Sequence, residues 1–188
     1  MAYGKGAAAV RADHRRHDGV PLHFSVPAVE GLQDNALQQA LNRKYLDENT
    51  KLYQEFLDTI GQKEVSPQVL ALYTNYKIKT QSKDLLVVEG VKTEIAGSGR
   101  ETVAYDNIDL KDQMIITLPS LFKDDSYVDV ISSYILAQMK QLTNKDQGIL
   151  YWYEDSEFIT GFKAIKPGQT FYINADSKLT IAFDECDV

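Results

Sequence analysis

The side chains best suited to chemistry in this chain of 188 residues include three histidines, which lie within ten residues of one another. His14 and His17 have the i, i+3 spacing that could offer two imidazole nitrogens to Zn²⁺, with His23 close behind. A stable zinc site needs further ligands held in tetrahedral geometry, and the neighbouring Arg15 and Arg16 oppose a cation. We therefore expect neither a metal site nor a cofactor.

Acidic side chains gather in two places, which are Glu154, Asp155 and Glu157, and Asp184, Glu185 and Asp187. Paired carboxylates could serve glycoside hydrolysis, which needs two groups at a set separation across a cleft. They could also bind Ca²⁺, which needs a looped alternation of oxygens ending in a bidentate Glu. Neither pattern is visible, so we expect a solvated acidic surface or a contact for a basic partner.

Three aromatic residues, Tyr151, Trp152 and Tyr153, directly precede the first acidic group. Tyr and Trp are preferred in protein interfaces and as platforms for sugars. The alternative is a buried strand with Trp152 in the core, because a lone Trp is usually largely buried. No nucleophile elbow, Walker loop, dinucleotide fingerprint, His-Glu-x-x-His or Cys-x-x-Cys is present, so we expect a binding module and not an enzyme.

The elements that must position these residues begin with an edge strand over 22–26, where apolar and polar residues alternate between Pro21 and Pro27. From Asp34 to Ile60 the apolar residues recur at four- and seven-residue intervals, which predicts a helix capped by Asp34 and ended by Gly61. After Pro67 the period becomes two, which predicts an antiparallel meander. Its strands are expected at 70–79, 85–95, 102–110 and 114–116, with turns at 82–84, 97–99 and 111–113.

A second amphipathic helix is expected over 126–142, capped by Asp124 or Asp125, with Leu142 on its inward face. The chain closes with a hairpin in which two apolar runs flank the turn 174–177. Together these patterns predict an α+β fold, with an antiparallel meander sheet and two amphipathic helices packed on one face.

Composition limits the partners. The net charge of −7 and pI of about 5.0 disfavour nucleic acid and anionic lipid, because both require a basic surface. No transmembrane run or signal peptide is evident, so we expect no membrane contact by this segment itself. Cys186 is the only cysteine and cannot form an internal disulfide. We expect a flexible lead-in over 1–18 and a single domain over 19–188.

Four motifs in order carry a family resemblance: Pro27-x-x-x-Gly31-Leu32; Leu41-Asn42 with Lys51-Leu52-Tyr53-x-x-Phe56; Tyr105-Asp106 followed by Ile116 to Asp124; and the Phe171-Tyr172-Ile173-Asn174 hairpin. This set resembles the extracellular domain of RsiV-type anti-sigma factors, which also occurs beside some peptidoglycan deacetylases. The family continues past its hairpin into a Pro-Gly turn and a last strand, which we expect to be missing here.

The resemblance implies an extracellular sensor of a membrane-anchored bacterial protein that binds a basic protein, c-type lysozyme, and so triggers stepwise proteolysis that releases a sigma factor. The acidic charge of the chain suits such a partner. The contact residues expected on this basis are Tyr151, Trp152, Tyr153, Glu154, Asp155, Asp184 and Glu185. The alternative is a non-catalytic accessory domain of a cell-wall enzyme, which would bind peptidoglycan.

Overall fold

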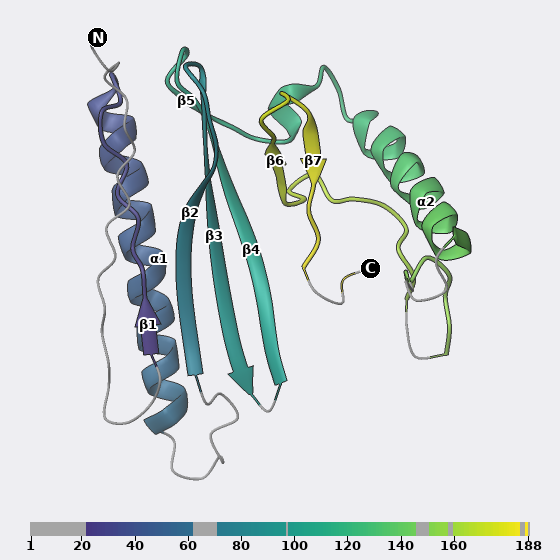
Figure 1. The fold of residues 1–188 in the computed structure, drawn as a ribbon, viewed down its shortest axis with the longest axis horizontal. Coiled ribbons are helices and arrows are strands. Elements are labelled where there is room, and N and C mark those ends of the chain that lie inside the picture. Colours follow the sequence, from purple (N-terminus) through teal and green to yellow (C-terminus); the bar gives the residue numbers. More distant parts are fainter. Residues whose placement is uncertain are drawn as a thin grey trace.

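The computed structural model describes residues 22–61, 71–96, 98–145, 151–157, 160–184 and 187. The predicted lead-in over 1–18, together with Glu185 and Cys186, lies outside these residues. The elements, shown in Figure 1, are β1 (Leu22–Phe24), α1 (Asn35–Gly61), β2 (Ala71–Gln81), β3 (Leu85–Ala96), β4 (Ser98–Asp109), β5 (Met114–Ile116), the 3₁₀ helix η1 (Pro119–Leu121), α2 (Tyr127–Lys145), β6 (Phe171–Ile173) and β7 (Leu179–Ile181).

The main sheet has five strands in the order β1-β2-β3-β4-β5. Strand β1 runs parallel to β2 at one edge, and every other neighbouring pair in this sheet is antiparallel. Strands β6 and β7 form a separate antiparallel hairpin. The predicted α+β fold with an antiparallel meander is therefore confirmed. Neither described helix is both long and apolar enough to cross a membrane.

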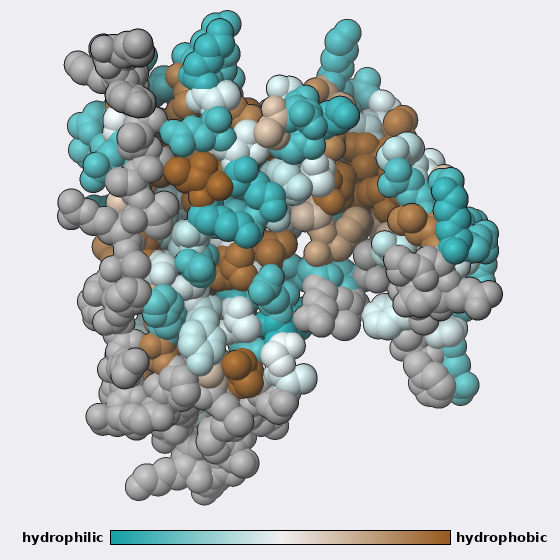
Figure 2. All heavy atoms as spheres, viewed as in Figure 1, coloured by the Kyte–Doolittle hydropathy of each residue, from teal (hydrophilic) through white to brown (hydrophobic). Residues whose placement is uncertain are grey.

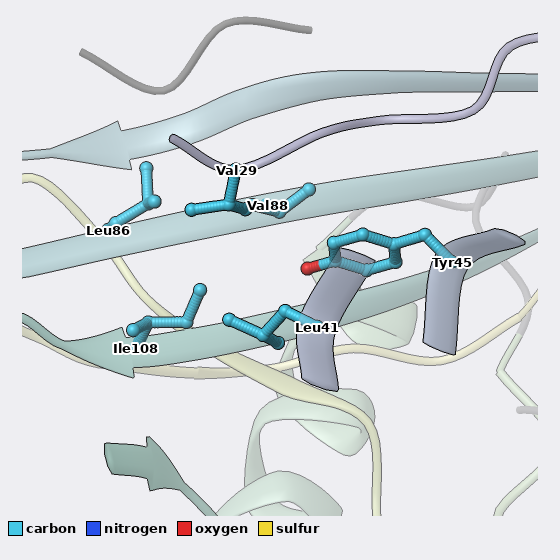
Figure 3. Close-up of a cluster of buried hydrophobic side chains, with 6 residues drawn as sticks. All are labelled: Val29, Leu41, Tyr45, Leu86, Val88 and Ile108. Atoms are coloured by element: carbon cyan, nitrogen blue, oxygen red, sulfur yellow. The ribbon is translucent and has the colours of Figure 1, made fainter. Parts of the chain in front are cut away.

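Helix α1 covers one face of the sheet. It begins where expected, because the Asp34 carboxylate accepts hydrogen bonds from the backbone N–H groups of Ala36 and Leu37 at 2.8 and 3.1 Å. Side chains alternate along a strand, so the even-numbered residues of β3 and β4 point towards α1. The resulting core, drawn in Figure 3, contains Val29, Leu41, Tyr45, Leu86, Val88 and Ile108.

The Leu-Asn motif of α1 has a structural role at this core. Leu41 is buried in it, and the next residue, Asn42, reaches the chain that leads from β1 into the helix. The Asn42 amide accepts from the Val29 N–H at 2.7 Å and donates to the Val29 carbonyl at 3.0 Å. The side-chain amide thus replaces a strand partner and holds Val29 in the core.

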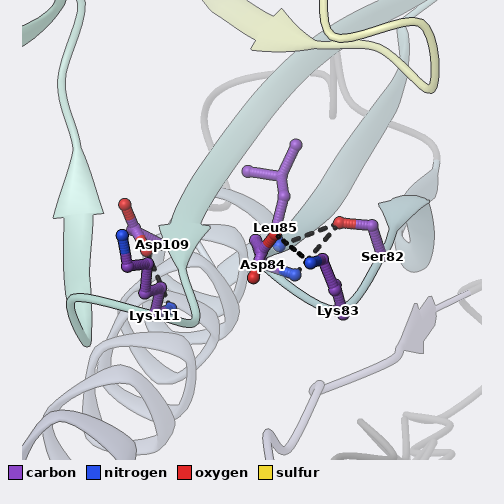
Figure 4. A network of polar contacts seen from close by, with 6 residues as sticks. All are labelled: Ser82, Lys83, Asp84, Leu85, Asp109 and Lys111. Atoms are coloured by element: carbon purple, nitrogen blue, oxygen red, sulfur yellow. Dashed lines mark hydrogen bonds and ion pairs between the residues drawn. The ribbon is translucent and has the colours of Figure 1, made fainter.

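Short polar turns set the register of the meander (Figure 4). Between β2 and β3, the Ser82 hydroxyl accepts from the N–H groups of Asp84 and Leu85 at 3.2 and 3.0 Å. Between β4 and β5, the Asp109 carboxylate accepts from the Lys111 N–H at 2.8 Å. The two turns touch, because the Leu110 N–H donates to the Asp84 carbonyl at 2.8 Å. The predicted turns at 82–84 and 111–113 are confirmed.

The β6–β7 hairpin lies against the opposite face of the sheet, where the odd-numbered residues of β3 and β4 point. Asn107 of β4 is buried there, and its amide donates to the Phe171 carbonyl at 3.1 Å and accepts from the Ile173 N–H at 2.9 Å. The Thr80 hydroxyl donates to the Ile173 carbonyl at 2.9 Å. The backbone groups of β6 that point away from β7 are therefore hydrogen-bonded by side chains of the sheet.

Helix α2 does not share a face with α1, contrary to the expectation that both helices pack on one face. Its apolar side, including Ile131 and Ile135, packs in a separate cluster with Leu118, Ile165 and Phe171. Figure 1 shows α1 on one side of the sheet and the hairpin with α2 on the other. The hairpin supplies the apolar surface that α2 covers, so α2 forms a further layer beyond it.

A buried carboxylate reinforces the hairpin face. Glu89 of β3 has a side chain only 4% exposed, and its two oxygens pair with the ammonium groups of Lys77 and Lys79 at 2.6 and 2.8 Å. The Lys79 ammonium also lies 4.9 Å from the Tyr172 ring centre, and that ring packs on Tyr105 with centroids 4.7 Å apart. Burial disfavours the charged form of Glu89, but the hydrogen bonds from the two lysines outweigh it and lower its pKa.

We predict that Asn107→Ala lowers the free energy of unfolding by about 2–4 kcal/mol, because it leaves the buried Phe171 carbonyl and the half-buried Ile173 N–H without their partner. Urea denaturation followed by circular dichroism measures the effect. Asn75→Ala, at an exposed position of strand β2, is the control and should change stability little. Equal stability of the Asn107 variant and the parent would contradict the bridging role of this amide.

Glu89→Gln should lower stability at pH 7 and reduce its dependence on acid pH. The folded pKa of Glu89 lies below its ordinary value, so its contribution is complete above the unfolded pKa and is lost as pH falls through the folded pKa. Urea denaturation at several pH values between about 7 and 3 should show the two stability curves converging in acid. The exposed Glu101 supplies the control, Glu101→Gln. Parallel curves for parent and Glu89→Gln would refute the pairing.

Candidate functional site

An apolar groove lies between α2 and β7. It has a volume of about 630 Å³, and its walls include Val130, Tyr134 and Leu142 from the helix, Leu179 and Ile181 from the strand, and Tyr151 from the chain that follows α2. Figure 2 shows hydrophobic residues gathered where the hairpin meets the first half of α2. An apolar hollow at the surface is a common feature of sites that bind another molecule.

The helix wall of the groove includes two side chains that are largely exposed, those of Val130 and Tyr134. Val130 is 68% exposed and Tyr134 is 64% exposed, whereas Met139 of the same helix is 4% exposed. Val130 and Tyr134 stand four positions apart, so they form a second apolar stripe beside the buried one. The Tyr134 hydroxyl accepts a hydrogen bond from the Gln138 amide at 2.8 Å, which orients the ring along the helix.

Sequence reasoning missed Val130 and Tyr134, although their four-residue spacing was a readable signal. Leu142 was expected on the inward face, but it is 40% exposed and lies in the groove wall. The exposure of Leu142 follows from its place along the helix. The hairpin faces the middle of α2 and covers Ile131 and Ile135, whereas Leu142 stands nearer the end of the helix.

The aromatic triplet divides between the groove and its flank. Tyr151 lines the groove, and all three of Tyr151, Trp152 and Tyr153 are half-buried, between the exposed and buried alternatives. The Trp152 carbonyl accepts from the Phe162 N–H at 2.6 Å, which holds this segment against residues 160–163. The Lys140 ammonium of α2 lies 5.7 Å from the Tyr153 ring centre.

The first acidic group contains one residue with a structural role. Asp155 accepts from the Gly161 N–H at 3.0 Å and pairs with the Lys163 ammonium at 2.8 Å. The hydrogen bond from Lys163, and then that from Gly161, hold the pKa of Asp155 below its ordinary value. A Cβ atom at Gly161 would come within 2.6 Å of the Tyr153 and Glu154 backbone, so this close approach requires glycine. Glu154 is exposed.

The second acidic group also takes part in the fold. Asp184 accepts from the Val103 N–H at 2.9 Å, and this contact attaches the chain after β7 to β4. Glu185 lies outside the described residues, and Asp187 is exposed. Asp155 and Asp184 are thus both engaged in contacts within the fold. Among the predicted contact residues that are described, Tyr151 is a wall of the groove and Glu154 offers an exposed charge nearby in the chain.

A second hollow, of about 390 Å³, lies between α1 and the sheet, and its lining includes Lys44, Tyr45 and Asp106. Lys44 and Asp106 form an ion pair at 2.6 Å, so the charges there compensate each other. Across the residues that the structure describes, no group of three or more His, Cys, Asp or Glu side chains could hold a metal ion. His23 lies near the Ser25 hydroxyl, at 3.2 Å.

The chain is similar in sequence to one family of proteins and to one anti-sigma factor. Residues 119–188 match the family described as a protein of unknown function, DUF3298. The chain is 38% identical over 172 residues to the anti-sigma-V factor RsiV of Bacillus subtilis strain 168, an alignment that covers 91% of this chain and 59% of that protein. The chain thus spans less than two thirds of the length of this relative.

Two DUF3298 proteins of known structure were also matched. One from Bacteroides fragilis NCTC 9343 has a TM-score of 0.50 at 16% identity, covering 90% of this chain and 81% of that one. Another from Pseudomonas aeruginosa PAO1 has a TM-score of 0.45 at 14% identity, covering 74% of this chain and 66% of that one. The first likeness concerns the fold alone.

We predict that Lys163→Gln raises the pKa of Asp155 towards its ordinary value, because the variant removes the ammonium that stabilises the carboxylate. Carboxyl-carbon NMR over an acid titration measures this pKa directly. Lys166→Gln, an exposed lysine three positions further on, is the control and should leave Asp155 unchanged. An unaltered Asp155 pKa in Lys163→Gln would show that the ion pair with Lys163 does not stabilise the carboxylate.

Proposed function

Because this chain is a relative of RsiV-type anti-sigma factors, as its motifs indicated, we propose that it is a non-enzymatic, ligand-sensing domain of an anti-sigma factor. The 38% identity over 172 residues carries this proposal. The domain would lie on the outer surface of a bacterial cell, as part of a membrane-anchored protein. Binding of a basic protein such as c-type lysozyme would expose the anti-sigma factor to regulated proteolysis and release its sigma factor.

The groove supports a protein partner. Val130 and Tyr134 are exposed apolar side chains in a hollow that can admit complementary side chains, and interfaces favour Tyr at such positions. Tyr151 from the predicted contact set contributes to the same groove. Burial of these side chains by a partner would slow its dissociation.

Charge supports a basic partner. The chain carries a net charge of −7, which attracts a cationic protein over long range and accelerates encounter. Glu154 is exposed, whereas Asp155 and Asp184 are engaged within the fold. We therefore assign long-range attraction to the whole acidic surface and close contact to the groove, with Glu154 as the nearest of the predicted carboxylates in sequence.

The alternative, a non-catalytic accessory domain that binds peptidoglycan, draws on the same aromatic side chains, because sugar rings stack on Tyr faces. Sedimentation of the chain with insoluble peptidoglycan distinguishes the two functions. Retention on peptidoglycan, without binding to a soluble basic protein, would favour the accessory function.

Titration with a c-type lysozyme at about 0.15 and 0.5 M salt should show saturable binding that weakens at the higher salt, where charges are more strongly screened. We predict that the double variant Val130→Ser, Tyr134→Ser weakens binding at least about tenfold, or about 1.4 kcal/mol. Both side chains are exposed, so the fold should survive, as circular dichroism can verify.

The control is Leu46→Ser, which removes an apolar side chain of α1 that is 55% exposed and lies outside the groove. It should bind like the parent. Failure of the folded parent chain to bind lysozyme would reject lysozyme as the partner. Parent-like binding by the double variant would instead place the contact away from the groove.

A further inference from the structure

The backbone of β7 has a free edge. The hairpin bonds Asn174 N–H to the Lys178 carbonyl at 3.0 Å and Ala182 N–H to the Thr170 carbonyl at 2.8 Å. Hydrogen-bonded pairs alternate with non-bonded pairs in an antiparallel ladder, so Thr180 faces β6 whereas Leu179 and Ile181 direct their N–H and carbonyl groups away from it. Among the described residues, no hydrogen bond is recorded for these outward groups of Leu179 and Ile181.

The other edge of the hairpin is different. The outward groups of β6 are occupied by the side chains of Asn107 and Thr80. Only the β7 edge therefore remains open for pairing within this described hairpin. Leu179 and Ile181 are also walls of the groove, so the free edge and the exposed apolar residues of α2 border the same hollow.

A free strand edge beside an apolar groove can receive an extended chain. Such a chain pairs its backbone with the edge, and every second side chain enters the groove. The exposed rings and methyl groups of Tyr134 and Val130 would meet those side chains. This mode satisfies the backbone groups and the apolar surface together, whereas packing of a helix in the groove would leave the edge unpaired.

The net charge of the chain favours a cationic partner over a second copy of this chain at the β7 edge. A second copy would bring together two bodies that each carry a net charge of −7, which opposes association, whereas a cationic partner is attracted. We propose that an extended, apolar segment of a cationic protein partner adds as a strand to the free edge of β7, with its side chains in the α2 groove. This inference rests on the proposed function and specifies how the partner is held.

Amide hydrogen exchange by NMR tests the inference, with a c-type lysozyme as the probe. On saturation, exchange at Leu179 and Ile181 should slow at least about tenfold, because their N–H groups become hydrogen-bonded. Thr180 and Ala182 already bond within the hairpin and are internal references that should change less. Saturable binding without added protection at Leu179 and Ile181 would overturn strand addition and leave the proposed function standing.

A pair of variants isolates the backbone group. Leu179→Pro removes an N–H that the hairpin does not use, and proline is tolerated at such edge positions. Leu179→Ala removes the side chain and keeps the N–H. Strand addition predicts that Leu179→Pro binds at least about fivefold more weakly than Leu179→Ala, with the hairpin of both verified by NMR. Equal affinities would contradict the inference.

Two further outcomes would also overturn strand addition by a cationic partner. No binding of lysozyme to the folded parent would reject the proposed partner, and the inference would fall with it. Protection of Leu179 and Ile181 in the chain alone, rising with its concentration, would identify the occupant as a second copy and overturn the cationic partner.

Discussion

The arrangement of this molecule depends on a buried side-chain amide, that of Asn107. It bonds the carbonyl of Phe171 and the N–H of Ile173 from within the face of the sheet, and so holds the hairpin by one edge. Because β6 is occupied in this way, β7 is the strand turned towards α2, and α2 packs on the hairpin instead of joining α1. Asn42 does the same for Val29 on the opposite face. Two amides thus fix backbone segments on opposite sides of the meander, with Asn107 bonding the hairpin to the sheet and Asn42 bonding Val29 to α1.

Local elements could be read from the sequence because their signals are local. The α1 cap at Asp34, the turns at 82–84 and 111–113, and the closing hairpin all follow from periodicity and turn chemistry within a few residues. The packing of α2 could not be predicted, because an amphipathic face fits either a sheet or a hairpin equally well. Buried Asn107 and Glu89 stand within strands of alternating pattern, where their burial depends on partners far along the chain.

The candidate site was predicted in part. The aromatic triplet led to Tyr151 and hence to one wall of the groove, whereas the acids were chosen by their clustering alone. Asp155 and Asp184 turned out to bond Gly161, Lys163 and Val103, contacts that sequence spacing does not reveal. The family motifs acquire physical meaning as well: Tyr105 packs on the hairpin ring of Tyr172, and Asp106 pairs with Lys44 on the other face. These two contacts lie on opposite faces of the sheet, one with the hairpin and one with α1.

The parallel edge strand has a consequence for the order in which the molecule assembles. Strands β2 to β5 are joined by short turns and can pair as soon as they emerge, but β1 aligns Leu22 with Leu72, across the whole of α1. Pairing β1 with β2 costs the entropy of closing that long loop, and only three residues of β1 form the strand that offsets this cost. We therefore expect β1 to pair late in folding and to detach early in unfolding. Tension applied at the amino end of the domain would therefore peel β1 from the sheet while the meander, the hairpin and α2 remain intact.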